Sequence, residues 1–275
     1  MKNKINSKFL FLFLLISFVM FGCSKSYGGI DYTSDDPQYN TKIIAHRGFW
    51  NCSGSAENSI SSLVNAQKIE VYGSEFDVWL TSDNVAVIHH DAIINGLVIE
   101  KSLYSQIKDF KLSNGEKIPT LENYLNQGRK SLKTKLIMEI KPYSNVQKEN
   151  SAVSLILGLV KKYAIESNVE FISFSYNICT TIKKEYPKSI VCYLGGNLSP
   201  AKLKESDISG LDYDFNVINK NINWFDDAKK MKLRTMVWTV DNDSVMQEFI
   251  SKGVDCITTN NPIKLFELLK KMNAK

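Results

Sequence analysis

Short apolar runs recur along the chain, and most are followed by a stretch whose apolar positions have helical spacing. Eight runs are predicted to be strands, at residues 42–46, 74–79, 136–141, 169–175, 190–194, 215–218, 235–240 and 256–259. Residues 85–89 extend the second strand as a hairpin, and helices are expected at about 57–71, 146–163, 223–231, 244–251 and 262–272, with another opening at Leu121. Strands that alternate with helices are typical of a parallel sheet.

The number and rhythm of these units favour a closed (β/α)8 TIM barrel over an open doubly wound sheet, since such a barrel takes roughly 250 residues. We assign residues 42–275 to this α/β domain. No glycine-rich phosphate loop follows the first strand, which disfavours a dinucleotide-binding fold. Residues 92–120 exceed an ordinary connection, and we expect an insertion there, after the second strand unit and over the carboxyl ends of the strands.

The composition is that of a globular protein. The chain has 275 residues, of which 44% are hydrophobic and 23% charged, which excludes a disordered or low-complexity protein. Its formal net charge of +5 is mild and its basic residues form no run, so no nucleic-acid partner is expected.

The N-terminus has the pattern of a bacterial signal peptide, which we assign to residues 1–22. Lys2, Lys4 and Lys8 precede an apolar run at 9–21 that is too short to span a bilayer comfortably. The run leads to Gly22 and Cys23, and a small residue before a cysteine here resembles a lipobox.

Cys23 is therefore predicted to become the lipidated first residue of the mature chain. Residues 23–41 would then be this lipidated cysteine and a polar, flexible tether. The expected location is the bacterial cell envelope, with the protein lipid-anchored and facing the periplasm or the outer membrane. A plain secreted protein and an uncleaved anchor are the alternatives.

The four other cysteines show no metal-binding or redox spacing. Cys52, Cys179, Cys192 and Cys256 form neither a zinc knuckle nor a CxxC pair. An oxidising compartment permits disulfides, but we favour burial of these residues as small apolar side chains.

Three acidic residues are expected to meet at one end of the barrel. Glu75 and Asp77 are two apart on a predicted strand, so they share a face, and Glu139 shares a face of the next strand with Lys141. Buried carboxylates without partners cost several kcal/mol, which suggests a bound cation. Ligation by oxygen alone favours Mg²⁺ or Ca²⁺ over zinc.

Two of the three histidines also lie at strand ends. His46 ends the first strand and precedes Arg47 and Gly48, and His90 ends the second unit and precedes Asp91. Each piece alone fits an ordinary role, such as a strand end, a same-face ion pair or a surface turn. Their joint occurrence at the ends of the first three strands points to a catalytic site.

The motifs in order resemble a known family. They are His46-Arg47-Gly48, Glu57-Asn58-Ser59, Glu75-Phe76-Asp77, His90-Asp91, Pro119-Thr120-Leu121, Glu139-Ile140-Lys141, Val237-Trp238-Thr239-Val240 and Gly253-Val254-Asp255. This order is similar to that of the glycerophosphodiester phosphodiesterases over about residues 42–270. The resemblance implies a TIM barrel, a divalent cation, and hydrolysis of glycerophosphodiesters to an alcohol and sn-glycerol 3-phosphate.

The chain departs from the family pattern in three places. Ala56 and Ser59 flank Glu57-Asn58 where the family usually has Pro-Glu-Asn-Thr, and Asn260 follows Thr259 where the family often has Thr-Asp. Residues 92–96 replace an Arg-Thr-Thr-Gly type run near the substrate, which leaves the preferred alcohol open.

The resemblance also implies a role for each residue. Glu75, Asp77 and Glu139 would hold the cation, Ca²⁺ or Mg²⁺. His46 and His90 would act as general acid and base on opposite sides of phosphorus, in an order the sequence leaves open.

The remaining site residues would bind the substrate. Arg47 would be catalytic as well as phosphate-binding, and Lys141 would add a second positive charge. Trp238 would pack on the glycerol carbons or in the barrel core, and Glu57 would join the substrate-binding group. A phosphodiesterase for lysophospholipids, sphingolipids or inositol lipids, and a non-catalytic lipoprotein, are the alternative functions.

Overall fold

The computed structural model describes residues 38–274. The predicted signal peptide, the lipidation site at Cys23 and tether residues 24–37 lie outside these described residues. Among residues 38–274, no helix is both long enough and apolar enough to cross a bilayer.

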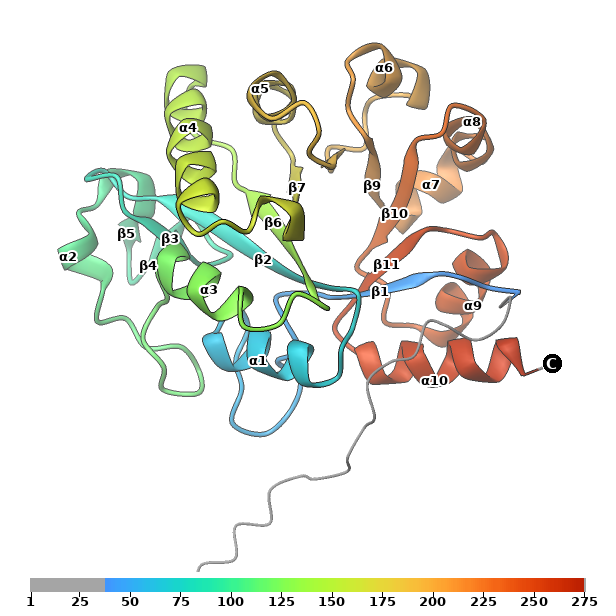
Figure 1. The fold of residues 1–275 in the computed structure, drawn as a ribbon, viewed down its shortest axis with the longest axis horizontal. Coiled ribbons are helices and arrows are strands. Elements are labelled where there is room, and N and C mark those ends of the chain that lie inside the picture. Colours follow the sequence, from blue (N-terminus) through green and yellow to red (C-terminus); the bar gives the residue numbers. More distant parts are fainter. Residues whose placement is uncertain (1–37, 275) are drawn as a thin grey trace, which may run out of the picture.

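Eight parallel strands form a closed barrel, which confirms the predicted fold class (Figure 1). They are β1 Lys42–Ala45, β2 Gly73–Leu80, β6 Lys135–Ile140, β7 Val169–Ser173, β8 Val191–Tyr193, β9 Gly210–Asp214, β10 Arg234–Trp238 and β11 Cys256–Thr259. Each pairs with its neighbours in chain order, and β1 closes the barrel by pairing with both β11 and β2. The carboxyl ends of all eight strands therefore meet at one mouth.

Helices follow the strands and cover the outside of the barrel (Figure 1). They are α1 Ile60–Lys68, α3 Leu121–Gly128, α4 Val146–Lys162, α5 Tyr176–Glu185, α6 Pro200–Glu205, α7 Phe215–Lys220, α8 Trp224–Lys230, α9 Asp243–Ser251 and α10 Pro262–Asn273. Several begin at a side-chain cap: Ser59 accepts from the Ser62 N–H, and Thr120 from the Asn123 N–H.

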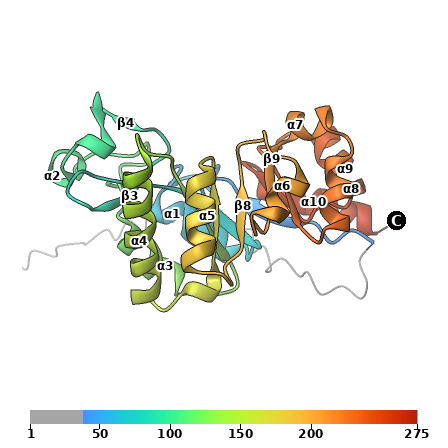
Figure 2. The ribbon, with the colours of Figure 1, turned by 90° about the horizontal axis from the view of Figure 1, so that it is seen from above.

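The predicted hairpin and insertion lie beside β2. β3, Ala86–Ile88, runs antiparallel to β2. The insertion carries β4 Ile93–Ile94, β5 Leu97–Val98, a 3-10 helix at Ile99–Lys101 and α2 Tyr104–Ile107. Figure 2 shows α2 and β4 at the end of the molecule opposite to α8 and α9. A separate apolar cluster that includes Trp79, Ile94 and Ile107 packs the insertion against the hairpin.

The barrel has two apolar regions, inside and outside its wall. The larger lies between the strands and the helices. A small inner cluster consists of Ile44, Ile137, Ile172, Cys192, Leu194, Met236 and Cys256. Cys179, Cys192 and Cys256 are buried free thiols, as expected, whereas Cys52 is half-buried and accepts a hydrogen bond from Asn65.

Two predicted elements are wrong in position. The sixth strand is not 215–218, which forms α7; it is β9, Gly210–Asp214. Leu211 and Tyr213 are the buried outward-facing residues of β9, while Gly210 and Asp212 interrupt its apolar pattern on the inner side. The first helix begins at Ile60 rather than at Glu57, because Asn58 has a φ of 59° and Ser59 is the cap.

Gly48 makes the turn after β1 possible. It has a φ of 78° and follows Arg47, whose φ is 54°, so two successive residues are left-handed. A Cβ added at Gly48 would lie 2.3 Å from Ser62 Oγ and 2.8 Å from the Ser62 carbonyl carbon, on α1. The approach of α1 to this turn therefore requires glycine.

Gly54 provides a matched control for this constraint, because its φ is 75° and an added Cβ there meets nothing within 4 Å. We expect Gly54→Ala to lower the free energy of unfolding by about 1 kcal/mol, the cost of the left-handed backbone. Gly48→Ala should cost about 1–3 kcal/mol more, because the Cβ overpacks against α1. Urea unfolding measures both, and equal losses would contradict the proposed close contact.

Candidate active site

The site residues come from the carboxyl ends of β1, β2 and β6 and from the segment after β3. His46 and Arg47 directly follow β1, Glu75 and Asp77 lie on β2, and Glu139 lies on β6. Asp77 and Glu139 are register partners on adjacent strands. The sheet pairing thus brings together residues that are far apart in the sequence.

The three carboxylates gather closely enough to hold a metal ion. One oxygen each from Glu75, Asp77 and Glu139 lies within 4.8 Å of the others, and all three residues are buried. Burial, reinforced by the charges of Asp77 and Glu139, raises the pKa of Glu75 well above its ordinary value. Burial and Asp77 also raise the pKa of Glu139. Carboxylates held this close repel one another, and all their ligand atoms are oxygens. Such a group fits a hard divalent cation.

Lys141 and Asn58 hold Asp77 within this triad. Lys141 Nζ lies 2.7 Å from Asp77 Oδ1 and 2.8 Å from Glu139 Oε1. Asn58 Nδ2 donates to Asp77 Oδ2 at 2.7 Å, and Asn58 Oδ1 accepts from the Asp77 N–H at 3.1 Å. Burial alone raises the pKa of Asp77, but Lys141 and Asn58 outweigh it and leave that pKa below its ordinary value. Asn58 belongs to the motif Glu57-Asn58-Ser59, but its contact with Asp77 was not predicted from the sequence.

Arg47 connects the first strand to the triad. Its backbone N–H donates to Glu75 Oε2 at 2.7 Å, and its Nη1 donates to Glu57 Oε2 at 2.5 Å. Its Nε is buried without a hydrogen-bond partner, 3.9 Å from Asp77 Oδ2. The bond to Glu57 and the nearby Asp77 hold the guanidinium in place, and its remaining N–H groups can bind a ligand anion.

The side-chain amide of Asn260 orients His46, and the carboxylate of Asp241 orients that amide. Asn260 Nδ2 donates to Asp241 Oδ2 at 2.7 Å, so Asn260 Oδ1 faces His46 Nδ1 at 2.8 Å and accepts from it. This arrangement places the proton on Nδ1 and leaves Nε2 as the basic nitrogen. Burial, followed by the charge of Arg47, lowers the pKa of His46. The role of Asp241 was not predicted, because it depends on the contact between the ends of β10 and β11.

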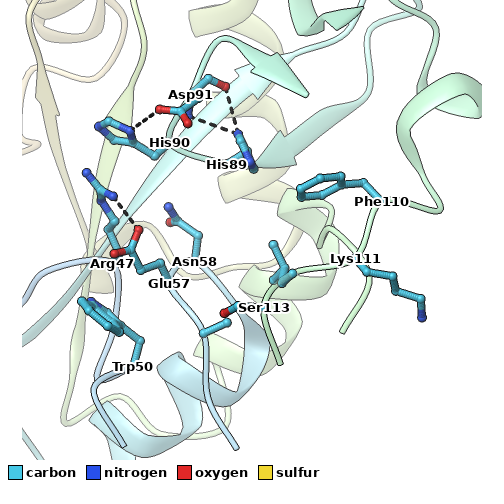
Figure 3. Close-up of a pocket in the computed structure, with 12 residues that line it drawn as sticks. Arg47, Trp50, Glu57, Asn58, His89, His90, Asp91, Phe110, Lys111 and Ser113 are labelled. Carbon is cyan, nitrogen blue, oxygen red and sulfur yellow. Dashed lines mark hydrogen bonds and ion pairs between the residues drawn. The ribbon is translucent and has the colours of Figure 1, made fainter. Parts of the chain in front are cut away.

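The two neighbouring histidines differ in their contacts. His90 Nδ1 lies 2.8 Å from Asp91 Oδ1, whereas His89 Nδ1 lies 2.9 Å from the Asp91 carbonyl oxygen. The ring of His89 packs edge-on against Phe110 of the insertion, 5.5 Å between centroids. Figure 3 shows the His90 ring on the side of Arg47 and the His89 ring on the side of Phe110.

Two cavities meet at Arg47 and His90. The outer cavity, of about 290 Å³, lies between Trp50, Glu57 and insertion residues 110–113 (Figure 3). The inner cavity, of about 120 Å³, is lined by His46, Glu75, Glu139 and Lys141 on one side. Among residues 38–274, only Arg47 and His90 line both cavities.

The other side of the inner cavity is apolar and aromatic. Trp238 lines it together with Phe174, at 5.6 Å between ring centroids in an edge-on arrangement. Trp238 Nε1 donates to the Asp212 carbonyl oxygen at 2.9 Å, which fixes the ring. Trp238 therefore faces the cavity, whereas Glu57 lies on the outer side of Arg47. Phe174 and Asp212 were missed as cavity residues.

Comparisons with known proteins identify the family to which the chain belongs. Residues 46–264 match the model of the Glycerophosphoryl diester phosphodiesterase family. A glycerophosphodiester phosphodiesterase of Caldanaerobacter subterraneus subsp. tengcongensis is 30% identical over 248 residues, which cover 84% of this chain and 98% of that protein.

Solved structures share the fold. A glycerophosphodiester phosphodiesterase from Parabacteroides distasonis has a TM-score of 0.84 and 44% identity, covering 85% of this chain and 98% of its own. An Oleispira antarctica phosphodiesterase, solved in complex with the product sn-glycerol-3-phosphate, has a TM-score of 0.71 and 23% identity, covering 83% of this chain and 96% of its own.

The repulsion within the triad gives metal binding a defined pH dependence. Because the pKa values of Glu75 and Glu139 are raised, the cation-free protein binds protons that the unfolded chain releases, so its stability falls as the pH rises. A cation binds the deprotonated triad. We therefore expect saturating Ca²⁺ or Mg²⁺ to raise Tm by roughly 5–10 °C at about pH 8, and by less than half as much at about pH 5.5.

Thermal unfolding with cation and with chelator measures this difference. Glu139→Gln should abolish the cation-dependent shift, while Glu57→Gln, a carboxylate outside the triad, should keep it. A shift of equal size at both pH values, or one that survives Glu139→Gln, would show that the cation binds elsewhere.

Proposed function

The chain belongs to the Glycerophosphoryl diester phosphodiesterase family and is an enzyme of that class, and we propose that it releases sn-glycerol 3-phosphate by acid–base catalysis through His46 and His90. The observation that carries this proposal is the position of Arg47 and His90 at the junction of two cavities, next to the carboxylate triad. A phosphodiester bound at this junction would have one ester group in each cavity.

The phosphate is proposed to bind at this junction. Arg47 offers the charge of its guanidinium and the N–H groups that do not bond to Glu57. Lys141 is buried beside the triad and supplies a second positive charge. A phosphodiester carries one negative charge that repels nucleophiles, so these groups lower the barrier by neutralising its oxygens.

Glu75, Asp77 and Glu139 are proposed to hold one divalent cation, Ca²⁺ or Mg²⁺. When bound, such a cation supplies Lewis-acid stabilisation of the phosphate oxygens. Asn58 keeps Asp77 oriented toward the triad, and the Arg47 N–H does the same for Glu75.

The contacts of the two histidines suggest their division of labour. His46 has a free Nε2 and a lowered pKa, which suit it to accept a proton from the nucleophile. His90 lines the outer cavity, where the leaving alcohol is proposed to bind, and its Nδ1 lies 2.8 Å from Asp91 Oδ1. We therefore assign proton donation to the leaving alcohol to His90.

The glycerol 3-phosphate part is proposed to occupy the inner cavity and the alcohol the outer cavity. The inner cavity is small and combines apolar rings with polar groups, as a three-carbon polyol requires. The outer cavity is bordered by exposed residues of the insertion, including Ser113, and so admits alcohols of different size. The product found in the Oleispira antarctica phosphodiesterase supports release of the same product by this chain.

Attachment to a bacterial membrane through a lipid on Cys23 is a further part of the proposal. It is supported by the basic, apolar and small-residue pattern that precedes Cys23. The chain enters the barrel at Tyr39–Thr41, beside α10, where the Tyr39 N–H donates to Asn273 Oδ1 at 2.9 Å. This entry lies at the amino end of β1, opposite the mouth that carries the site.

Substitution of the histidines tests the catalytic assignment. We expect His46→Ala and His90→Ala each to lower kcat about 10²–10⁴-fold, because each removes one proton transfer. His89→Ala is the matched control: its ring lines the outer cavity beside Phe110, so the substitution should change kcat less than about 3-fold, with any larger effect confined to KM. Release of glycerol 3-phosphate from glycerophosphocholine is the assay, with Tm and cation binding checked for each variant. Full activity in a folded His46→Ala or His90→Ala variant would refute the acid–base pair.

Fractionation of cells that express the full chain tests the anchor. The protein should be recovered with membranes. Cys23→Ser removes the lipidation site, so the variant should leave the membrane fraction or keep an uncleaved signal peptide. Mass spectrometry of the mature N-terminus identifies the lipid. A processed chain without lipid would show that the protein is secreted instead.

A further inference from the structure

Asp212 is a buried carboxyl group that the proposed mechanism does not use. It lies in the middle of β9, is 1% exposed, and lines the inner cavity. Its Oδ1 has no hydrogen-bond partner. Buried polar atoms are nearly always paired, so an unpaired carboxylate oxygen at a cavity wall points to a missing ligand.

The surroundings of Asp212 offer it no obvious structural partner. Its neighbours in the barrel interior include the apolar side chains of Ile172 and Leu194 on the cavity wall and of its register neighbour Met236. Arg234 lies one layer below, but its Nη1 pairs with Glu170 at 3.0 Å and its Nη2 contacts Tyr72 Oη at 2.7 Å. Burial raises the pKa of Asp212 to about 7, although the charge of Arg234 opposes that shift.

Asp212 is also not one of the gathered metal-ligating residues. Among residues 38–274, the acidic group close enough to share an ion consists of Glu75, Asp77 and Glu139. Asp212 lies across the inner cavity from these residues, on the strand next to Trp238. The ligand it lacks is therefore a hydrogen-bond donor that enters through the cavity.

We propose that Asp212 binds the terminal hydroxyl of the substrate's glycerol group, the hydroxyl farthest from phosphorus. This proposal rests on the proposed function, which places the phosphate at Arg47 and His90 and the glycerol carbons against Trp238. The glycerol chain then continues inward, and its last oxygen reaches the deepest polar group. Arg234 and Glu170 pair with each other deeper in the barrel and are not among the residues that line the cavity, whereas Asp212 is.

The consequence is selection for fully deacylated substrates. A lysophospholipid with an acyl group on the terminal oxygen has no proton to donate to Asp212, and the closed barrel below leaves no path for the chain. A site built to bind a hydroxyl discriminates strongly against a ligand that lacks it, because its own polar group is then left unpaired. Asp212 is thus a specificity-determining residue.

The test compares two substrates in wild type and variants: glycerophosphocholine and its analogue in which the terminal hydroxyl is replaced by hydrogen. Wild type should prefer glycerophosphocholine by about 100-fold in kcat/KM, as expected for a hydrogen bond to a charged group. Asp212→Leu should lower kcat/KM for glycerophosphocholine by most of that factor and leave the value for the analogue unchanged or higher. Asp212→Asn should give an intermediate loss and retains the shape of the side chain if leucine perturbs folding.

The controls separate a role of Asp212 in substrate binding from a role in folding. Removal of an unpaired buried carboxyl should leave Tm unchanged or raise it. Met236→Leu, in the same layer and outside the cavity, should keep the wild-type preference between the substrates. Lysophosphatidylcholine should be hydrolysed by wild type at least about 100-fold more slowly than glycerophosphocholine.

Failure of the Asp212 proposal can be distinguished from failure of the proposed function. If wild type does not hydrolyse glycerophosphocholine, the proposed function fails. If it does, and Asp212→Leu and Asp212→Asn lower kcat/KM equally for both substrates, Asp212 has only a structural role. Wild-type hydrolysis of lysophosphatidylcholine at the rate of glycerophosphocholine would also overturn the specificity.

Discussion

Mutual repulsion among three buried carboxylates is the constraint around which the site is organised. Glu75, Asp77 and Glu139 lie within reach of one ion, in surroundings that raise the pKa values of Glu75 and Glu139 but leave that of Asp77 lowered. The contacts that keep them in place come from three different parts of the chain: the Arg47 backbone, the Asn58 amide and the Lys141 ammonium. Two of these contacts, from Arg47 and Lys141, come from residues that we propose bind the phosphate. One network of contacts therefore compensates the negative charge of the triad and positions the positive charges that we propose bind the ligand.

The barrel accommodates this network because most of its polar side chains lie in a different layer from its apolar side chains. Apolar side chains fill the wall on the helix side and much of the interior, and the polar side chains gather at the mouth, where the carboxyl ends of the strands meet. Asp212 is an exception, since it brings a carboxyl group one layer deeper, and the ion pair of Arg234 with Glu170 lies deeper still. Such a local conflict with good packing is more often found at a binding site than in a purely structural core.

The second half of the site comes from segments outside the barrel strands. The turn through Arg47 and Gly48 depends on left-handed backbone and on close contact with α1. The insertion brings residues 110–113 to the outer cavity, opposite Trp50 and Glu57. The strands and the residues that directly follow them therefore carry the groups that we propose act on phosphorus, and loops border the cavity that we propose holds the alcohol. In this proposal the alcohol specificity can vary without disturbing the catalytic groups.

The sequence alone determined the barrel, its insertion and the residues of the triad, because strand periodicity assigns Glu75, Asp77 and Glu139 to inner faces and the motif order limits the family. It misplaced the sixth strand, because the inward-facing Gly210 and Asp212 interrupt the apolar run that marks a strand. Only the tertiary structure joined Asn58 to Asp77, Asp241 to His46 through Asn260, and Asp212 to the cavity. These contacts join positions far apart in the chain, and local periodicity carries no information about which loops meet when the barrel closes.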